Sequence, residues 1–272
     1  MAVIDTHVHV GCADTVAHPR RPTGVGGAWW TDGEGSAAAV FGAARSAGVD
    51  RVVVVQAVGA YGYDASCAAA SVVESAGSAT LVAAPDMSVE DPCASIGVHI
   101  DSPHLSGLRL FGVADGAPWL DDARGDTVME RCTDRGVVAV PTIFSDRLPS
   151  LRGLMSRHPR ATVALDHCAF PDMAGDDGER ALFSLADVGG LHLKVSSHVL
   201  AAWRRQGRLD DVFGRLVEVF GVSRMCWGSD HPQHQGLDYA GKLDLARRAS
   251  RHLSEADREE FFAGTATRLG WG

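Results

Sequence analysis

The regular spacing of short β-branched runs constrains the fold of this chain more than any other feature. Eight apolar runs follow one another, and from the second onward they recur at intervals of about 25 to 33 residues. They begin near residues 2, 51, 79, 107, 137, 161, 191 and 224. A continuous apolar run suits a strand that is covered on both faces of a parallel sheet. The interval between runs is the length of a βα unit.

Segments with helical periodicity lie between these runs, at 36–49, 65–77, 126–136, 148–158 and 210–221. Several of them end in glycine just before the next run, as a helix C-cap does. A further helical segment, 254–270, closes the chain. The pattern predicts an α/β fold, a (β/α)8 TIM barrel that forms a single domain over residues 1–272. A doubly wound open sheet is the alternative, but no glycine-rich phosphate-binding sequence follows the first run.

The first interval is nearly 50 residues long, and the excess falls in a segment rich in glycine, tryptophan and histidine, residues 11–35. A long loop without periodicity commonly forms a lid or a binding loop. We expect a lid after strand 1, with Trp30 over the substrate. A passive surface insertion is the alternative.

Composition and charge indicate which kinds of partner the protein can bind and where in the cell it acts. A net charge of −9 lacks the clustered positive charge that nucleic-acid binding needs. No apolar run reaches the roughly 18 residues of a membrane span, and no signal peptide is visible at the N-terminus. We therefore expect a cytoplasmic protein with a small-molecule substrate and neither a membrane nor a nucleic-acid partner. The six cysteines stand singly, which favours buried thiols over a zinc ribbon or a disulfide framework.

In a TIM barrel the chemistry is built where the strands end, at their carboxyl side. The first predicted strand ends in His7-Val8-His9. Strict alternation along a strand puts Asp5, His7 and His9 on one face, directed into the barrel mouth. Asp5 would then lie deeper and orient a histidine.

The sixth and eighth predicted strands end in Asp166-His167 and Asp230-His231. Since Asp166 precedes His167, alternation points Asp166 away from the mouth and gives it a structural role. A mouth-facing aspartate beside histidines is costly unless it binds a cation, pairs with a histidine or acts as a base. We therefore interpret His7, His9, His167 and Asp230 as a catalytic group.

Other strand ends supply candidate substrate contacts, namely Gln56 on strand 2, Arg109 on strand 4, Lys194 on strand 7 and His231 after strand 8. A guanidinium group binds a carboxylate through two parallel hydrogen bonds. Arg109 therefore favours a small carboxylated substrate.

Several segments carry a family resemblance, among them IDTHVHV, VALDHCAFPD and CWGSDHP. With HxH on strand 1, DHxxxP on strand 6 and GSDxP on strand 8, the chain resembles the amidohydrolase superfamily. It is most similar to the branch that contains 2-pyrone-4,6-dicarboxylate lactonase and the sugar-lactone hydrolases. The resemblance covers nearly the whole chain and implies a TIM-barrel hydrolase. The branch usually has a tryptophan where this chain has His231, which leaves its substrate preference open.

The resemblance also bears on the metal. Many members of the superfamily have a lysine or histidine at the ends of strands 4 and 5, whereas this chain has Arg109 and no histidine there. A two-metal site is therefore not expected. One Zn²⁺ or another divalent ion held by His7, His9 and Asp230, and metal-free catalysis in which the histidines polarise the carbonyl, both stay open.

We interpret the chain as a hydrolase in which water attacks a lactone, ester or amide carbonyl, with Asp230 as general base and His167 as a second catalytic group. A non-oxidative decarboxylase on the same site is one alternative. A small-molecule-binding barrel without catalysis is an alternative of another class. The substrate's identity and the oligomeric state stay open.

Overall fold

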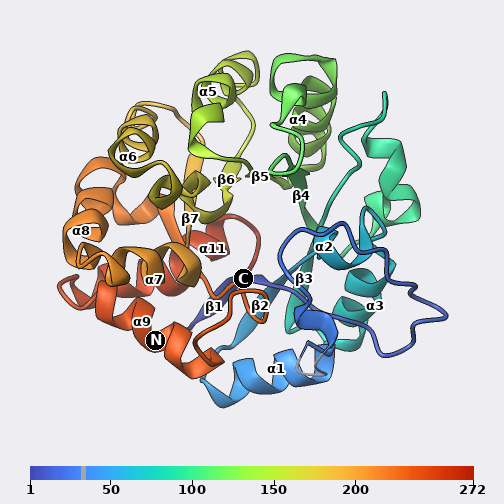
Figure 1. Ribbon diagram of the computed structural model, residues 1–272, viewed down its shortest axis with the longest axis horizontal. Coiled ribbons are helices and arrows are strands. Elements are labelled where there is room, and N and C mark those ends of the chain that lie inside the picture. The colour runs from blue at the N-terminus through green and yellow to red at the C-terminus, as the bar shows by residue number, and fades with distance from the viewer. Residues whose placement is uncertain (32–34) are drawn as a thin grey trace.

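The computed structural model describes residues 1–31 and 35–272, and it shows a ring of strands surrounded by helices (Figure 1). The strands are β1 Ile4–Val8, β2 Arg51–Val55, β3 Ala79–Ala83, β4 Leu105–Phe111, β5 Val138–Thr142, β6 Val163–Leu165, β7 Leu191–Ser196 and β8 Met225–Gly228. All neighbours pair in parallel in the order β1 to β8. The ring closes where the Asp230 N–H donates to the His7 carbonyl and the His9 N–H donates to the His231 carbonyl, both at 2.8 Å. The predicted (β/α)8 barrel is confirmed.

Helices follow most of the strands. They are α1 Ala37–Ser46, α2 Val58–Tyr61, α3 Ser66–Glu74, α4 Ala123–Arg135, α5 Leu148–Arg157, α6 Gly175–Phe183, α7 Ser197–Arg205, α8 Leu209–Phe220, α9 Tyr239–Ala249, α10 Glu255–Glu259 and α11 Thr265–Arg268. The connection from β3 to β4 differs from the predicted βα unit, because it contains a 3₁₀ segment, Cys93–Asp101, in place of an α-helix. Gly97 within it has φ 57°, which interrupts regular helical geometry.

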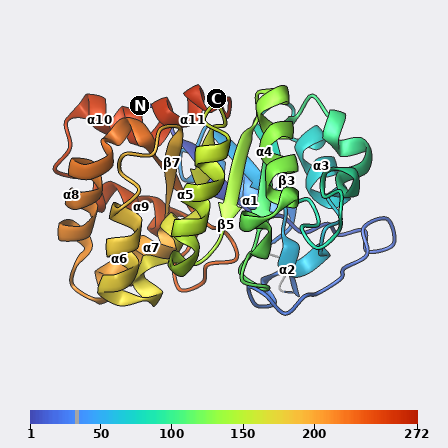
Figure 2. The same cartoon turned by 90° about the horizontal axis from the view of Figure 1, so that it is seen from above.

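The barrel interior is filled by small and β-branched side chains. They are Ile4, Val53, Val55, Val82, Val138, Val140, Ala164 and Cys226. The C-terminal segment closes one end of the barrel with Ala263, Ala266, Leu269 and Trp271, and α11 lies near the centre of Figure 1. Figure 2 shows both termini at that end and the long β1–α1 connection at the other. The open end is therefore the carboxyl end of the strands, as the sequence predicts.

The connection from β1 to α1 runs along α2. The Arg21 N–H donates to the Ala60 carbonyl at 2.8 Å, and the Thr23 N–H donates to the Gly59 carbonyl at 3.0 Å. Gly59 is required here, because a Cβ would lie 2.0 Å from the carbonyl oxygen of Val25. Part of the predicted lid, residues 32–34, lies outside the described residues.

The expectation that all the cysteines are free thiols is wrong for one pair. Cys12 in the β1–α1 connection and Cys67 in α3 form a disulfide with their Cα atoms 5.7 Å apart. The two residues are 55 positions apart in the sequence, so only the folded chain brings them together. The other four cysteines are free and buried, as expected.

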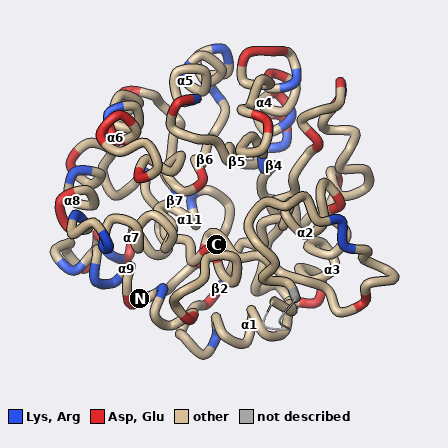
Figure 3. Tube along the Cα trace, in the orientation of Figure 1, with Lys and Arg blue, Asp and Glu red and all other residues tan. Residues whose placement is uncertain are grey.

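Acidic and basic residues are interspersed along the chain of the outer helices, and neither sign forms a continuous band in Figure 3. Within the described residues, no helix has both the length and the apolar character needed to cross a membrane.

Candidate active site

The end of β1 is irregular, and this irregularity determines which of its side chains face the barrel mouth. Its pairing with β2 shifts in register between Asp5 and Val8, so strict alternation does not hold there. The expectation that Asp5 shares a face with His7 and His9 is therefore wrong. The Asp5 carboxylate accepts the Tyr239 hydroxyl of α9 at 2.5 Å and the backbone N–H groups of His7 and Ser229 at 3.0 and 2.8 Å. Asp5 thus joins the backbones of β1 and β8 and contacts no histidine ring.

Three side chains from the ends of β1 and β8 meet at the barrel mouth, and we call them the His–Asp triangle: His7, His9 and Asp230. The two Nε2 atoms lie 3.2 Å apart. The Asp230 Oδ1 lies 3.8 Å from the Nε2 of His7 and 3.6 Å from that of His9. All three are buried. Asp230 has φ 54°, a left-handed backbone that an aspartate tolerates better than most residues.

In both histidines of the triangle, Nδ1 contacts a group outside the triangle. The Nδ1 of His9 donates to the Val55 carbonyl at 2.7 Å, and the Nδ1 of His7 contacts the Asp166 carboxylate at 3.1 Å. The Val55 carbonyl can only accept, so it fixes the His9 tautomer that leaves Nε2 free as a ligand. The Nδ1 of His7 also lies 3.0 Å from the Lys194 Nζ, and donation to Asp166 would leave its Nε2 free in the same way. Burial, assisted by the charge of Arg109, lowers the pKa of His9 to about 3, so its ring is neutral.

Asp230 has the property expected of a cation ligand. Its Oδ1 is buried and has no hydrogen-bond partner among the described residues. Burial raises the pKa of Asp230 to about 7, although nearby Lys242 and Arg109 oppose the rise. Four ligands at about 2.0–2.1 Å in a tetrahedron stand roughly 3.3 Å apart, close to the separations within the triangle. The three residues can therefore hold one divalent ion such as Zn²⁺, with a position left open for substrate.

Asp166 lies inside the site, contrary to the expectation that it points away. Val163 and Leu165 pack outward against the helices and Ala164 packs inward, so alternation directs Asp166 inward as well. His167 also reaches the site because its φ of 53° breaks the alternation after β6. The error therefore came from assuming that β6 continues as a strand through His167.

The Asp166 carboxylate is saturated with donors. Its Oδ1 lies 2.7 Å from the Lys194 Nζ and 3.1 Å from the His7 Nδ1. Its Oδ2 accepts the Thr142 hydroxyl at 2.7 Å and the Arg109 Nε at 3.2 Å. Burial opposes ionisation, but Lys194, His7 and Arg109 outweigh it and hold the pKa of Asp166 well below its ordinary value.

The occupied oxygens of Asp166 help to decide which of two groups of side chains can hold a metal ion. Asp166, His7 and His167 also lie close enough together to surround an ion. However, a carboxylate offers about four acceptor positions, and Asp166 already uses four. Its partner Lys194 also places a positive charge there. Of the two groups, the His–Asp triangle therefore has the geometry that suits one ion better.

His167 lies beside the triangle. Its ring centroid is 4.8 Å from that of His7, and its Nδ1 pairs with the Ser196 hydroxyl at 2.8 Å. Burial, with the charges of His198 and Arg109, holds the pKa of His167 well below its ordinary value despite Asp166. The ring is therefore a neutral group at the edge of the site.

The predicted substrate contacts divide into two groups. Gln56 and Arg109 brace the barrel: the Gln56 amide bonds the Gly62 carbonyl at 2.9 Å and the Ala84 N–H at 2.7 Å, and the Arg109 Nη1 donates to the Gln56 carbonyl at 3.2 Å. Lys194 is buried against Asp166. Trp30 packs in an apolar cluster with Trp29, Ala57, Ala60, Tyr61 and Cys67.

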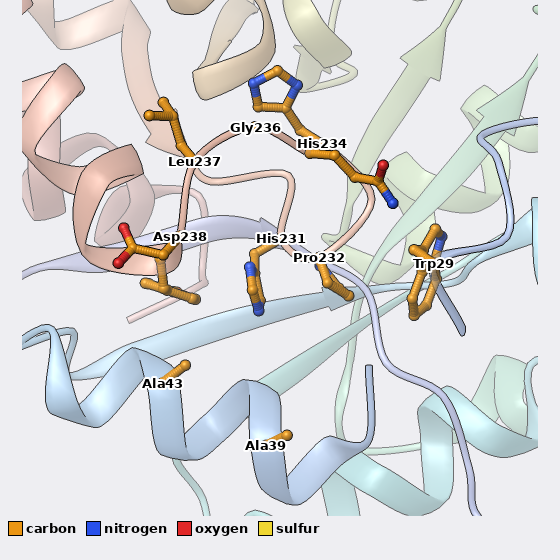
Figure 4. A pocket seen from close by; sticks show the side chains of 11 residues that line it. Trp29, Ala39, Ala43, His231, Pro232, His234, Gly236, Leu237 and Asp238 are labelled. Carbon is orange, nitrogen blue, oxygen red and sulfur yellow. The ribbon is translucent and has the colours of Figure 1, made fainter. Parts of the chain in front are cut away.

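His231 and Trp29 instead line a cavity (Figure 4). Trp29 stacks on the His9 ring at 6.0 Å between centroids, whereas its neighbour Trp30 contacts no ring of the triangle. The sequence analysis did not select Trp29, nor Thr142 and Ser196, which hold Asp166 and His167. Thr142 could have been selected from the sequence, because it is a polar residue at the end of the strand β5. No local pattern distinguishes Trp29 from Trp30.

Comparisons with known proteins give the family of the chain. The model of the amidohydrolase family (Amidohydro_2) matches residues 4–269. L-fucono-1,5-lactonase of Burkholderia ambifaria is 28% identical in an alignment of 205 residues, and the alignment covers 69% of each chain.

Two solved structures share the fold. A probable 2-pyrone-4,6-dicarboxylic acid hydrolase from Acinetobacter baumannii, with citric acid bound, superposes with a TM-score of 0.81 at 16% identity over 99% of each chain. An amidohydrolase from Burkholderia multivorans with bound zinc superposes with a TM-score of 0.77 at 21% identity over the whole of both chains. With a family match over nearly its whole length and this site at the barrel mouth, the chain belongs to the amidohydrolase family and is a hydrolase.

Proposed function

We propose that the protein hydrolyses the lactone ring of a small substrate that carries a carboxylate, with Asp230 as general base. The observation that carries the proposal is the Asp230 Oδ1, which is buried, lies 3.8 and 3.6 Å from two histidine Nε2 atoms, and has no donor among the residues that the structure describes. The similarity to an L-fucono-1,5-lactonase supports a lactone over an amide or a simple ester.

The residues suit base catalysis. A general base works best when its pKa lies near the operating pH, and burial raises the pKa of Asp230 to about 7. Asp230 would take a proton from the attacking water and return it to the ring oxygen that leaves. The neutral ring of His167, 4.8 Å from His7, lies where it would hydrogen-bond the substrate carbonyl.

We propose that His7, His9 and Asp230 hold one divalent ion, with Zn²⁺ the first candidate. When bound, such an ion supplies a Lewis acid that polarises the carbonyl group. The Val55 carbonyl keeps the His9 imidazole in the required tautomer, and His7 would reach the same tautomer by donating its Nδ1 proton to Asp166.

The charges of the site favour an anionic substrate. Lys194 and Arg109 balance Asp166 and Asp230, so a bound divalent ion would leave the site positive. We propose that the substrate carboxylate lies on the Arg109 side of the mouth and that His231 contacts another part of the substrate. Gln56, Lys194 and Trp30 would shape the walls from behind.

The test is a panel of lactones, esters and amides, with and without a carboxylate, assayed before and after chelation and with the metal content measured. We expect lactone hydrolysis and about one divalent ion per chain. Hydrolysis of none of these compounds would contradict the proposal. Full activity in metal-free, chelator-treated protein would support the proposed lactonase activity and refute the proposed role of a metal ion.

Non-oxidative decarboxylation is the second candidate, because the same buried ligands would suit it. Release of CO₂ from unsaturated or aromatic acids, without lactone hydrolysis, would favour it. Ligand binding without turnover would instead favour a binding barrel.

We further propose that residues 1–272 act as one domain and that the described part of the β1–α1 connection covers the site. The net charge of −9 supports a protein without a nucleic-acid partner, and we place it in the cytoplasm.

A further inference from the structure

A cavity of about 510 Å³ lies between α1 and the loop that joins β8 to α9 (Figure 4). Its described lining includes His231, the neighbour of Asp230, but none of the three residues of the His–Asp triangle. Ala39 and Ala43 of α1 form one wall, and their small side chains leave the space open. His231, the residue after Asp230, points from the opposite wall toward α1. Trp29 lines the same cavity and stacks on His9, so one aromatic ring lies between the cavity and the triangle.

Lys242 fixes the orientation of His231 from behind. Lys242 is fully buried in α9. The negative charges of Asp230, Asp5 and Asp238 act on its ammonium group, but within the described parts of the chain none of them forms a direct ion pair with it. Its Nζ lies 3.4 Å from the Nδ1 of His231, and Tyr239 packs edge-on against the same ring with centroids 4.9 Å apart. An ammonium group has only donors, so Nδ1 must accept and the proton of the neutral ring must sit on Nε2. His231 therefore offers an N–H donor on the side away from Lys242.

The rest of the lining defines the chemistry of a ligand. Asp238 lies at the rim, where its Oδ1 caps α9 by accepting the Gly241 N–H at 2.8 Å. Its negative charge disfavours an anion in the cavity. The apolar part of the lining is Trp29, Ala39, Ala43, Pro232 and Leu237. The polar part is His231 as a donor, Asp238 as an acceptor, and the side chains of His234 and Gln235. This combination suits a neutral group with an apolar face and several hydroxyls.

We propose that this cavity binds the neutral, hydroxylated arm or ring of the substrate, with His231 as the hydrogen-bond donor and Lys242 as its positioning residue. This inference rests on the proposed function and extends it. The carbonyl that is attacked lies at the triangle, the charged end lies toward Arg109, and the hydroxylated end lies between α1 and the β8–α9 loop.

The first test fills the cavity. Ala43→Leu and, separately, Ala39→Leu are assayed with D-glucono-1,5-lactone and with δ-valerolactone, which has no hydroxyl groups. We expect the preference for the hydroxylated lactone, as a ratio of kcat/KM values, to fall at least about tenfold, mainly through KM. Ala38→Leu, an exposed position of the same helix outside this cavity, is the matched control.

The second test addresses His231 and Lys242. His231→Phe removes the donor and is expected to lower the same ratio at least about tenfold. Lys242→Met keeps His231 but removes its fixed tautomer, so we expect the ratio to fall and the ¹⁵N shifts of His231 to change toward a mixture of tautomers. Lys242→Arg retains a donor and is expected to restore part of the preference.

An unchanged ratio in both alanine variants, or an equal loss with both lactones, would refute the cavity proposal while leaving the lactonase proposal intact. If the wild-type protein hydrolyses neither lactone, the cavity proposal is tested by binding instead. Calorimetry measures the affinity of the wild type and of Ala43→Leu for the non-hydrolysable D-glucono-1,5-lactam. Binding that weakens at least about tenfold in Ala43→Leu supports the cavity, and binding that is absent from the wild type or equal in both proteins refutes it.

Discussion

The Lys194 ammonium lies 2.7 Å from the Asp166 Oδ1, and both side chains are inaccessible to solvent. The same carboxylate oxygen contacts the Nδ1 of His7, so a buried ion pair holds a proposed metal ligand in place. Removing one partner of a buried pair leaves an uncompensated charge in a medium of low polarity.

Lys194→Met should therefore destabilise the protein by about 3–5 kcal/mol. Asp166→Asn combined with Lys194→Met should cost less than the sum of the two single changes, because each charge of this pair costs less to remove once its partner is gone. Arg109, which also contacts Asp166, loses that partner in both proteins that carry Asp166→Asn, so its loss does not enter the coupling. Urea denaturation of the four proteins measures the coupling. The exposed pair Arg251–Asp210 serves as the control, for which we expect a far smaller coupling. Additive effects at Lys194 and Asp166 would contradict a structural ion pair.

Asp230→Asn should lower kcat/KM by about 10²-fold or more, because an amide cannot accept the proton of the attacking water. Steady-state kinetics with the best lactone of the panel measure the effect, and circular dichroism verifies the fold. Asp257→Asn, at an exposed position in α10, is the matched control. A loss of less than threefold would remove Asp230 from the proposed mechanism.

His9→Asn should abolish most of the metal content, since it removes one of three protein ligands. Metal analysis of the purified variants tests this independently of activity. His252→Asn, an exposed histidine, should keep the wild-type content. The same measurement should give about one ion per wild-type chain and no second ion at Asp166, whose oxygens are already occupied. A ratio of two would contradict the single site.

Cys67→Ser should lower the stability of the oxidised protein by about 2–4 kcal/mol, because the disulfide to Cys12 restricts the unfolded chain over a separation of 55 residues. Thermal unfolding with and without reductant measures the effect, and the reductant should change the wild type but not the variant. Thiol titration of the denatured, unreduced protein should find four free thiols. A count of six free thiols would show that the purified protein lacks the Cys12–Cys67 disulfide, a result that a reducing cytoplasm would favour.

The barrel could be predicted because the signals for it are local. A β-branched run such as Val52–Val55 specifies a buried strand by its own composition, and the repeat of such runs specifies the βα units. The ends of these runs then indicated His7, His9 and Asp230, which the structure brings together. The 3₁₀ segment Cys93–Asp101 escaped prediction because regular spacing says nothing about what fills each connection.

The sequence by itself determined the number and order of the strands, the end of the barrel at which the polar residues gather, and the resemblance to the amidohydrolases. The tertiary structure alone decided where the side chains point. Alternation assumes an unbroken strand, but β1 shifts register between Asp5 and Val8, and His167 and Asp230 adopt left-handed backbones. These departures depend on neighbouring strands that are distant in the sequence, as do the Lys194–Asp166 pair and the Cys12–Cys67 bond. A local pattern cannot encode contacts that exist only when the barrel closes.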